Sequence, residues 1–219
     1  MTQDIAFRFA PHQQLATDLL RNGAPDAGDG AHDLSHVLRV WQNVQSIMAE
    51  EGGDPGLLVA ATILHDGVNL PKDHPDRSKA SQLSANRAES VLASLAWQQA
   101  AIDGVSHAIA AHSFSAGITP RTLEAKILQD ADRLDAIGHI GIARCFVVSG
   151  QLGRLIYDVD DPSAQSRTLD DGRFALDHFY TKLLRLAEGF QTRTGQRLAA
   201  ERHAVMLSFI EGLLAEISL

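Results

Sequence analysis

The chain has 219 residues, of which 45% are hydrophobic, so it is long and apolar enough to bury one substantial core. Charged residues make up 21%, with 19 Lys and Arg against 27 Asp and Glu, which excludes a mainly disordered chain. The net charge of -8 argues against broad binding to nucleic acid, although a small basic pocket can still hold one phosphate ester.

The single cysteine, Cys145, has no partner for an internal disulfide, so nothing in the sequence requires an oxidising compartment. The N-terminus lacks the basic-then-apolar order of a signal peptide, and no stretch reaches the roughly 18 apolar residues of a membrane span. We therefore expect a cytoplasmic protein that binds neither membranes nor nucleic acid.

Ala, Leu and Ile recur at spacings of three and four residues, and only 5% of the residues are aromatic, which predicts an all-α fold. Loops are expected over Gly67–Pro75 and Ser113–Pro120, and irregular structure over Gly150–Asp171. Three predicted helices come first in the chain: Gln3–Asn22, a helix capped by Asp33 that ends at Glu51, and a helix that Asp54-Pro55 begins and that carries Leu57–His65. The next three are Ser78–Leu95, Gln98–His112 and Pro120–Asp135. Gly138 and Gly141 mark a bend before a helical run to Val148, and the last two predicted helices are Arg173–Glu188 and about Gly195–Ile217.

The sequence shows no internal repeat and no clear domain boundary, so we expect one domain over residues 1–219. Its motif core spans about residues 31–150, and a C-terminal helical extension spans about residues 172–219. The last two predicted helices are long and amphipathic, and we expect them to close over the core or to pair with a second subunit in a homodimer.

Four residues offer ligands for a divalent transition ion: His36, His65, Asp66 and Asp132. They come from three predicted helices, and mixed imidazole and carboxylate ligands suit Mn, Fe, Co, Ni or Zn. Adjacent side chains of a helix point about 100° apart, so His65 and Asp66 can share an ion only where their helix ends at a cleft. The loop that begins at Gly67 permits such an end.

The residues alone leave the last ligand open between neighbouring carboxylates. Asp135 lies about 60° from Asp132 around a helix and can line the same cleft, whereas Asp130 points about 160° away. Taken singly, a His or Asp at a helix end is more often a cap or a surface group than a ligand.

Five ordered blocks of this sequence resemble the HD-domain superfamily of metal-dependent phosphohydrolases. The superfamily is named for an adjacent His and Asp pair, which in this sequence is His65-Asp66. The closest resemblance is to a bacterial branch of small nucleotide pyrophosphohydrolase-like proteins, over about residues 31–180. The blocks are His32–Val40, Leu64–Asp66, Pro71–Arg77, Ala111–Ser115 and Gln129–Gly138. The resemblance implies a compact helical bundle in one HD-type domain, and it implies that His36, His65, Asp66 and Asp132 are the metal ligands.

Further residues are candidates for the chemistry around the metal. A bound divalent ion (Mn, Ni, Co, Fe, Zn or Mg) lowers the pKa of its water and polarises a phosphoryl oxygen, and Asp66 can also orient that water. Lys72, and after it Arg77, can hold phosphate, or they are solvated surface charges. His112 can bind phosphate or protonate a leaving oxygen, or it caps its helix.

His107 lies about 140° from His112 around a helix, so the two are not expected to share an ion as neighbours. Arg39 and Asn43 share the helix face of His36 and can hydrogen-bond around the ligands, or they are ordinary polar helix residues.

The leading hypothesis is a divalent-metal-dependent phosphohydrolase that acts on a nucleoside triphosphate or another small nucleotide. Two other hydrolases stay open: a two-metal phosphodiesterase, which His107 and His112 would support, and a 5'-nucleotidase. A non-catalytic regulatory module that binds metal or nucleotide also stays open, because a fold alone does not guarantee turnover.

Overall fold

The computed structural model describes residues 5–23, 34–68, 70, 76–113 and 116–217. They form two compact units that divide between Asp132 and Arg133, and each unit is described by itself. Within the described residues, helices supply the regular structure, apart from one isolated β-bridge between Leu155 and Phe174. The all-α prediction is confirmed, whereas a single domain over the whole chain stays a prediction.

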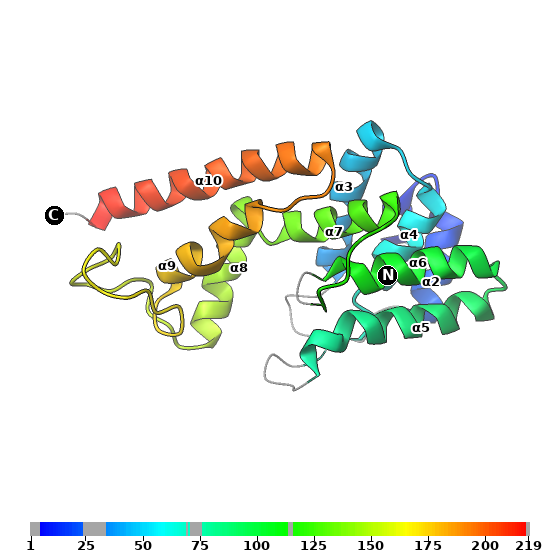
Figure 1. Cartoon of the computed structure of the whole chain (residues 1–219), viewed down its shortest axis with the longest axis horizontal. Coiled ribbons are helices and arrows are strands. Elements are labelled where there is room, and N and C mark those ends of the chain that lie inside the picture. Colours follow the sequence, from blue (N-terminus) through cyan, green and yellow to red (C-terminus); the bar gives the residue numbers. More distant parts are fainter. Residues whose placement is uncertain (1–4, 24–33, 69, 71–75, 114–115, 218–219) are drawn as a thin grey trace. The chain divides into compact units, whose positions relative to one another are not determined.

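The described part of the first unit consists of a series of helical elements (Figure 1). They are η1 (Phe7–Phe9), α2 (Gln13–Gly23), α3 (Leu34–Glu51), α4 (Pro55–Leu64), η2 (Arg77–Lys79), α5 (Ala80–Ser94), α6 (Gln99–His112) and α7 (Leu123–Asp135), whose last turn enters the second unit. Helix α4 is buried along Leu58–Leu64 and packs against α2, α3 and α6, while α5 and α6 lie side by side. A helix that is apolar on all sides belongs inside a core, so the end of α4 places His65 in the interior.

Local chemistry explains where these helices begin. The Asp54 carboxylate accepts hydrogen bonds from the amides of Gly56 and Leu57, at 2.8 and 3.0 Å, so the predicted cap of α4 is confirmed. The predicted helix Gln3–Asn22 is wrong between Ala10 and His12, because Pro11 lacks an amide hydrogen and separates η1 from α2. Its first two residues lie outside the described part of the chain. Helix α7 begins at Leu123 and not at Pro120, since Thr122 Oγ1 caps it by accepting the amide of Ala125.

The second unit contains α8 (Gly138–Gln151), the short consecutive turns α9 (Ala175–His178), η4 (Phe179–Leu183) and η5 (Leu184–Ala187), and α10 (Arg193–Ile217). The predicted bend before α8 is confirmed at Gly138, which has a φ of +70° and begins the helix. Gly141, the other glycine predicted to mark the bend, lies within α8, where a Cβ would be 2.4 Å from the Ala136 carbonyl oxygen. The predicted continuous helix Arg173–Glu188 is wrong, because α-helical, π-helical and 3₁₀ geometry follow one another there.

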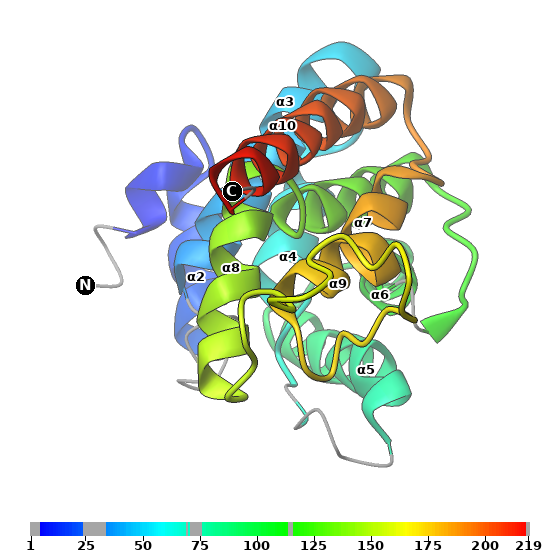
Figure 2. The same cartoon turned by 90° about the vertical axis from the view of Figure 1, so that its left-hand side faces the viewer.

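Residues 152–174 form an irregular segment that joins α8 to α9 (Figure 2), as the sequence predicted for most of its length. Two carboxylates organise it. The Asp161 carboxylate accepts hydrogen bonds from the backbone amides of Gln165 and Ser166, at 2.9 and 2.7 Å. The buried Asp177 carboxylate accepts hydrogen bonds from both terminal nitrogens of Arg167, at 2.6 and 2.8 Å. These charge-assisted bonds fix a segment that has no regular backbone pairing beyond the single bridge.

Candidate metal centre

Three helices of the first unit, α3, α4 and α7, bring the predicted ligands together. His36 lies in the first turn of α3 and is buried, and His65 is the buried C-terminal cap of α4. Asp66 follows directly, in the turn after α4, and Asp132 lies in the part of α7 that belongs to this unit. Residues that are 96 positions apart in the sequence, His36 and Asp132, are therefore neighbours in the fold.

The ligand atoms of these residues are closely spaced. His36 Nε2 lies 3.2 Å from His65 Nε2, and Asp66 Oδ2 lies 3.5 Å from each of these two nitrogens. Asp132 Oδ1 lies 3.4 Å from His36 Nε2 and 3.9 Å from His65 Nε2. His36, His65 and Asp66 form a group whose ligand atoms all lie within 4.8 Å of one another.

These separations fit a divalent ion. Metal–ligand bonds of about 2.1 Å that meet at tetrahedral or octahedral angles place neighbouring ligand atoms roughly 3.0–3.4 Å apart. The observed distances of 3.2–3.9 Å lie in that range or slightly above it. Two imidazoles and two carboxylates also balance the charge of a divalent transition ion, so the residues present can hold one.

The orientation of the His65 ring supports the same interpretation. His65 Nδ1 lies 2.8 Å from the Thr62 carbonyl oxygen, which only accepts hydrogen bonds, so Nδ1 carries the proton. The Nε2 lone pair of the neutral ring then faces the cluster, as a metal ligand requires. Burial lowers the pKa of His65, which keeps the ring neutral and able to coordinate an ion.

His112, at the end of α6, is a fifth member of the cluster. Its Nδ1 lies 2.6 Å from the Ile109 carbonyl oxygen, which leaves Nε2 pointing at Asp66 Oδ1, 3.7 Å away. Its ring meets the His65 ring edge-on, with centroids 5.0 Å apart. Burial opposes protonation of His112, but the Asp66 and Asp132 carboxylates outweigh it and raise the pKa of His112.

His107 does not share this position. Its Nε2 accepts the backbone amide of Arg121 at 3.0 Å, so it fixes the segment before α7. The angular divergence expected between His107 and His112 is confirmed, and only His112 reaches the carboxylate of Asp66.

The three carboxylates of α7 have different surroundings. Asp130 and Asp135 are buried, and Asp135 pairs with Arg144 at 3.0 Å. The side chain of Asp132 is 29% exposed and faces His36 and His65. The geometry therefore favours Asp132 over Asp135, the alternative that helical angles alone left open.

The segment after His65 and Asp66 is held by Arg87 and Ser84, which the sequence did not single out, and by Arg77, which it did. The Arg87 guanidinium donates to the Gly67 carbonyl, and Ser84 Oγ accepts the Val68 amide at 3.0 Å. Arg77, a predicted phosphate ligand, donates to the Leu70 carbonyl. Helix α5 and the turn before it thus position the backbone that follows Asp66. Lys72, the other predicted cation, lies outside the described residues, as does the predicted cap Asp33.

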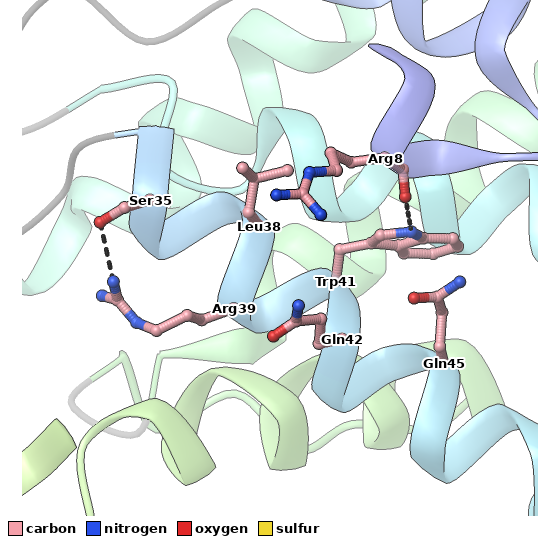
Figure 3. A pocket seen from close by; sticks show the side chains of 7 residues that line it. All are labelled: Arg8, Ser35, Leu38, Arg39, Trp41, Gln42 and Gln45. Carbon is pink, nitrogen blue, oxygen red and sulfur yellow. Dashed lines mark hydrogen bonds between the residues drawn. The ribbon is translucent and has the colours of Figure 1, made fainter. Parts of the chain in front are cut away.

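Asn43 and Arg39 differ, although both were expected on the face of His36. Asn43 is buried, and its Nδ2 donates to the Ala131 carbonyl at 2.9 Å, which ties α3 to α7 beside Asp132. Arg39 donates instead to Ser35 Oγ of its own helix at 2.7 Å (Figure 3). Asn43 therefore joins two of the helices that carry the predicted ligands.

The first unit is thus helical and has a His and Asp cluster suited to a metal ion, and similarity to known proteins specifies the family. The HD domain family model matches residues 33–137. The Bacillus subtilis (strain 168) protein YpgQ is 35% identical over 190 residues, which cover 85% of this chain and 84% of YpgQ. The chain therefore belongs to the HD-domain superfamily, as its motif blocks predicted.

Solved structures extend the likeness to nearly the whole chain. An HD-superfamily hydrolase from Bacillus thuringiensis has 30% identity and a TM-score of 0.68, over 97% of this chain and 96% of that one. YpgQ in complex with ADP has 31% identity and a TM-score of 0.66, over 99% of this chain and 97% of that one. Among the helices of the described residues, none combines the length and apolar character that a membrane span needs.

Proposed function

We propose that this protein is a divalent-metal-dependent phosphohydrolase whose substrate is a small nucleotide, with a nucleoside triphosphate as the leading candidate. The observation that carries the proposal is the convergence of His36, His65 and Asp66, whose ligand atoms all lie within 4.8 Å of one another. Asp132 Oδ1 adjoins this group, 3.4 Å from His36 Nε2 and 3.9 Å from His65 Nε2. Mn, Ni, Co, Fe, Zn and Mg are the candidate ions. When bound, such an ion supplies Lewis-acid polarisation of a phosphoryl oxygen and a water of lowered pKa.

The protein groups around the cluster have separate tasks in this proposal. The two buried imidazoles form the solvent-inaccessible side of the cluster. The side chains of Asp66 and Asp132 are 19% and 29% exposed and form its solvent-accessible, open side. A hydrolytic centre needs such an open side, because water and substrate must reach the ion. Asp66 Oδ2 faces the imidazoles while Oδ1 faces His112, so this carboxylate can hold a water and pass its proton towards His112.

A nucleotide substrate is supported by two lines of argument. YpgQ, a relative over most of this chain, was crystallised with ADP. The sequence blocks resemble a nucleotide pyrophosphohydrolase-like branch of the superfamily, which implies attack of water on the α-phosphorus. The bond from that phosphorus to the bridging oxygen would break, and the products would be a nucleoside monophosphate and pyrophosphate.

The two-metal phosphodiesterase alternative has less support. It used both His107 and His112 as additional ligands, but the Nε2 atom of His107 accepts the Arg121 amide. The non-catalytic alternative predicts nucleotide binding without products, so turnover separates it from the proposal.

Product analysis by phosphorus NMR tests the proposed function. The purified chain is incubated with nucleoside mono-, tri- and cyclic phosphates, each with Mn, Co, Ni or Mg or with a chelator. We expect pyrophosphate and a monophosphate from the triphosphate, loss of both with chelator or in Asp66→Asn, and retention in the matched histidine control His107→Ala. Full metal-dependent activity in a folded Asp66→Asn protein would refute the assigned centre, and a panel without products would favour the binding module.

A further inference from the structure

A pocket of about 340 Å³ lies between η1 and the exposed side of α3 (Figure 3). Its volume is at the lower end of the range in which proteins bind small molecules. The Arg8 side chain comes from η1, and the remaining lining residues come from α3, within the first unit. The pocket is therefore built by one unit alone.

The pocket is separate from the metal centre although it uses the same helix. His36 points into the core, and Gln42 and Gln45 lie about 120° and 180° from it around α3 at 100° per residue. Both glutamines line the pocket, whereas Asn43, on the face of His36, does not. A ligand here would touch the outer side of the helix whose inner side carries a proposed metal ligand.

The charge of the pocket is opposite to that of the chain. Of the described residues that line it, two are arginines and none is acidic, although the whole protein has a net charge of -8. Within the described part of the chain, the Arg8 guanidinium has no ion-pair or hydrogen-bond partner, and Figure 3 shows it beside Leu38 at the pocket. A guanidinium without a carboxylate partner attracts anions, and its planar donor geometry fits a phosphate group.

The rest of the lining is neutral and suits a polar organic molecule. Ser35, Gln42 and Gln45 offer hydroxyl and amide groups, which can hydrogen-bond to sugar hydroxyls, while Leu38 and Trp41 add apolar surface. The pocket is also held together: Trp41 Nε1 donates to the Arg8 carbonyl at 3.1 Å, and Phe9 stacks on Trp41 with ring centroids 5.2 Å apart. These contacts fix the backbone of Arg8 against α3.

We propose that this pocket is a second ligand site that binds a sugar phosphate, either free or as part of a nucleotide, with Arg8 as the main phosphate contact. Arg39 adds positive charge beside it. The site is independent of the proposed hydrolysis, because none of its lining residues belongs to the His and Asp cluster.

Tryptophan fluorescence tests this site without measuring activity. The chain contains two tryptophans, Trp41 and Trp97, so Trp97→Phe leaves the pocket residue as the sole reporter. The full chain carrying this substitution is titrated with ribose 5-phosphate, AMP, inorganic phosphate and ribose, with excitation at a wavelength that AMP does not absorb. We expect saturable changes with the two phosphate esters, weaker binding of inorganic phosphate and no response to ribose.

Variants on the Trp97→Phe background assign the signal. Arg8→Gln should weaken ribose 5-phosphate binding about tenfold or more, which is the effect of losing a hydrogen bond to a charged group. Arg21→Gln is the matched control, since it removes the same charge from an exposed position of α2 outside the pocket. Asp66→Asn should leave the titration unchanged, and circular dichroism and thermal melting establish that each variant is folded.

Three results would overturn the proposal. The first is equal binding in the folded Arg8→Gln and Arg21→Gln proteins. The second is a signal that Asp66→Asn abolishes, because that signal would report the metal centre. The third is no saturable response to any phosphate probe. Preference for AMP over ribose 5-phosphate would identify a nucleotide as the ligand, and equal affinity would identify the sugar phosphate alone.

Discussion

The buried hydrogen bond between Asn43 and the Ala131 carbonyl should couple the stability of the first unit to its affinity for metal. It joins α3, which carries His36, to α7, one residue before Asp132. Asn43→Ala removes the bond and shortens the side chain of a residue that is 6% exposed. A buried hydrogen bond lost in this way costs about 1–3 kcal/mol, so we expect a loss of about 2 kcal/mol without metal.

The same substitution should cost more when metal is bound. Loss of a group that orients the ligands typically weakens metal affinity about 10- to 100-fold. At a metal concentration of about 100 Kd, binding stabilises the native state by about 2.7 kcal/mol. A tenfold weaker Kd reduces this contribution to about 1.4 kcal/mol at the same concentration, so the total loss should rise from about 2 to about 3.3 kcal/mol.

Urea denaturation with chelator and with Mn²⁺ measures both quantities, and competition with a chelating dye gives the metal Kd. Ser46→Ala is the control, because Ser46 is exposed and its hydroxyl donates only to Gln42 of its own helix. We expect it to change stability by less than about 0.5 kcal/mol and not to change metal affinity. An equal loss for Asn43→Ala with and without Mn²⁺ would refute the coupling and leave Asn43 with a purely structural role.

Three further predictions address the proton path, the turn after the ligands and the acid stability of the second unit. His112→Ala should lower kcat about 100-fold or more, as expected for loss of a general acid or base, whereas His107→Ala should leave kcat unchanged. Similar steady-state rates for the two variants would contradict the role of His112 in proton transfer. Arg87→Gln removes the donor to the Gly67 carbonyl, so calorimetry should show metal binding weakened about tenfold, and unchanged affinity would argue against a positioning role. The backbone amides of Ser166 and Gln165 donate to Asp161 and lower its pKa to about 2, so the folded state binds this proton less tightly than the unfolded state. The ionised Asp161 therefore stabilises the folded state above about pH 4, and this stabilisation is lost as the pH falls towards 2. Carboxyl NMR should show this titration, Asp161→Asn should remove its pH dependence, and a titration midpoint near 3.8 would contradict it.

Much of the fold could be predicted because its signals are local. The Asp54 cap, the apolar run of α4 and Gly138 at the start of α8 each act within a few residues, and each has the expected effect. The failures also have local causes: Pro11 interrupts an otherwise periodic apolar run, and Thr122 caps α7 after Pro120. Apolar periodicity reports which face is buried, but it does not report where backbone hydrogen bonding stops.

Contacts that depend on tertiary packing could not be predicted. Arg87 and Gly67 are 20 residues apart, and their hydrogen bond exists only because α5 packs beside the turn after α4. The irregular turns over residues 175–187 follow contacts of the same kind, since Asp171 accepts hydrogen bonds from both His178 and Thr181. Such contacts override the helical periodicity of the sequence.

The carboxylates of α7 show why burial separates a proposed ligand from a structural group. A buried carboxylate needs a permanent partner to offset its desolvation, and Asp135 has one in Arg144. A carboxylate committed in this way has little freedom to exchange partners during a reaction. Asp132 is partly exposed and faces two imidazole nitrogens, so an ion can be its partner while solvent still reaches the site. Helical angles alone leave Asp132 and Asp135 on one side of α7, and it is the difference in their partners that favours Asp132 as the ligand.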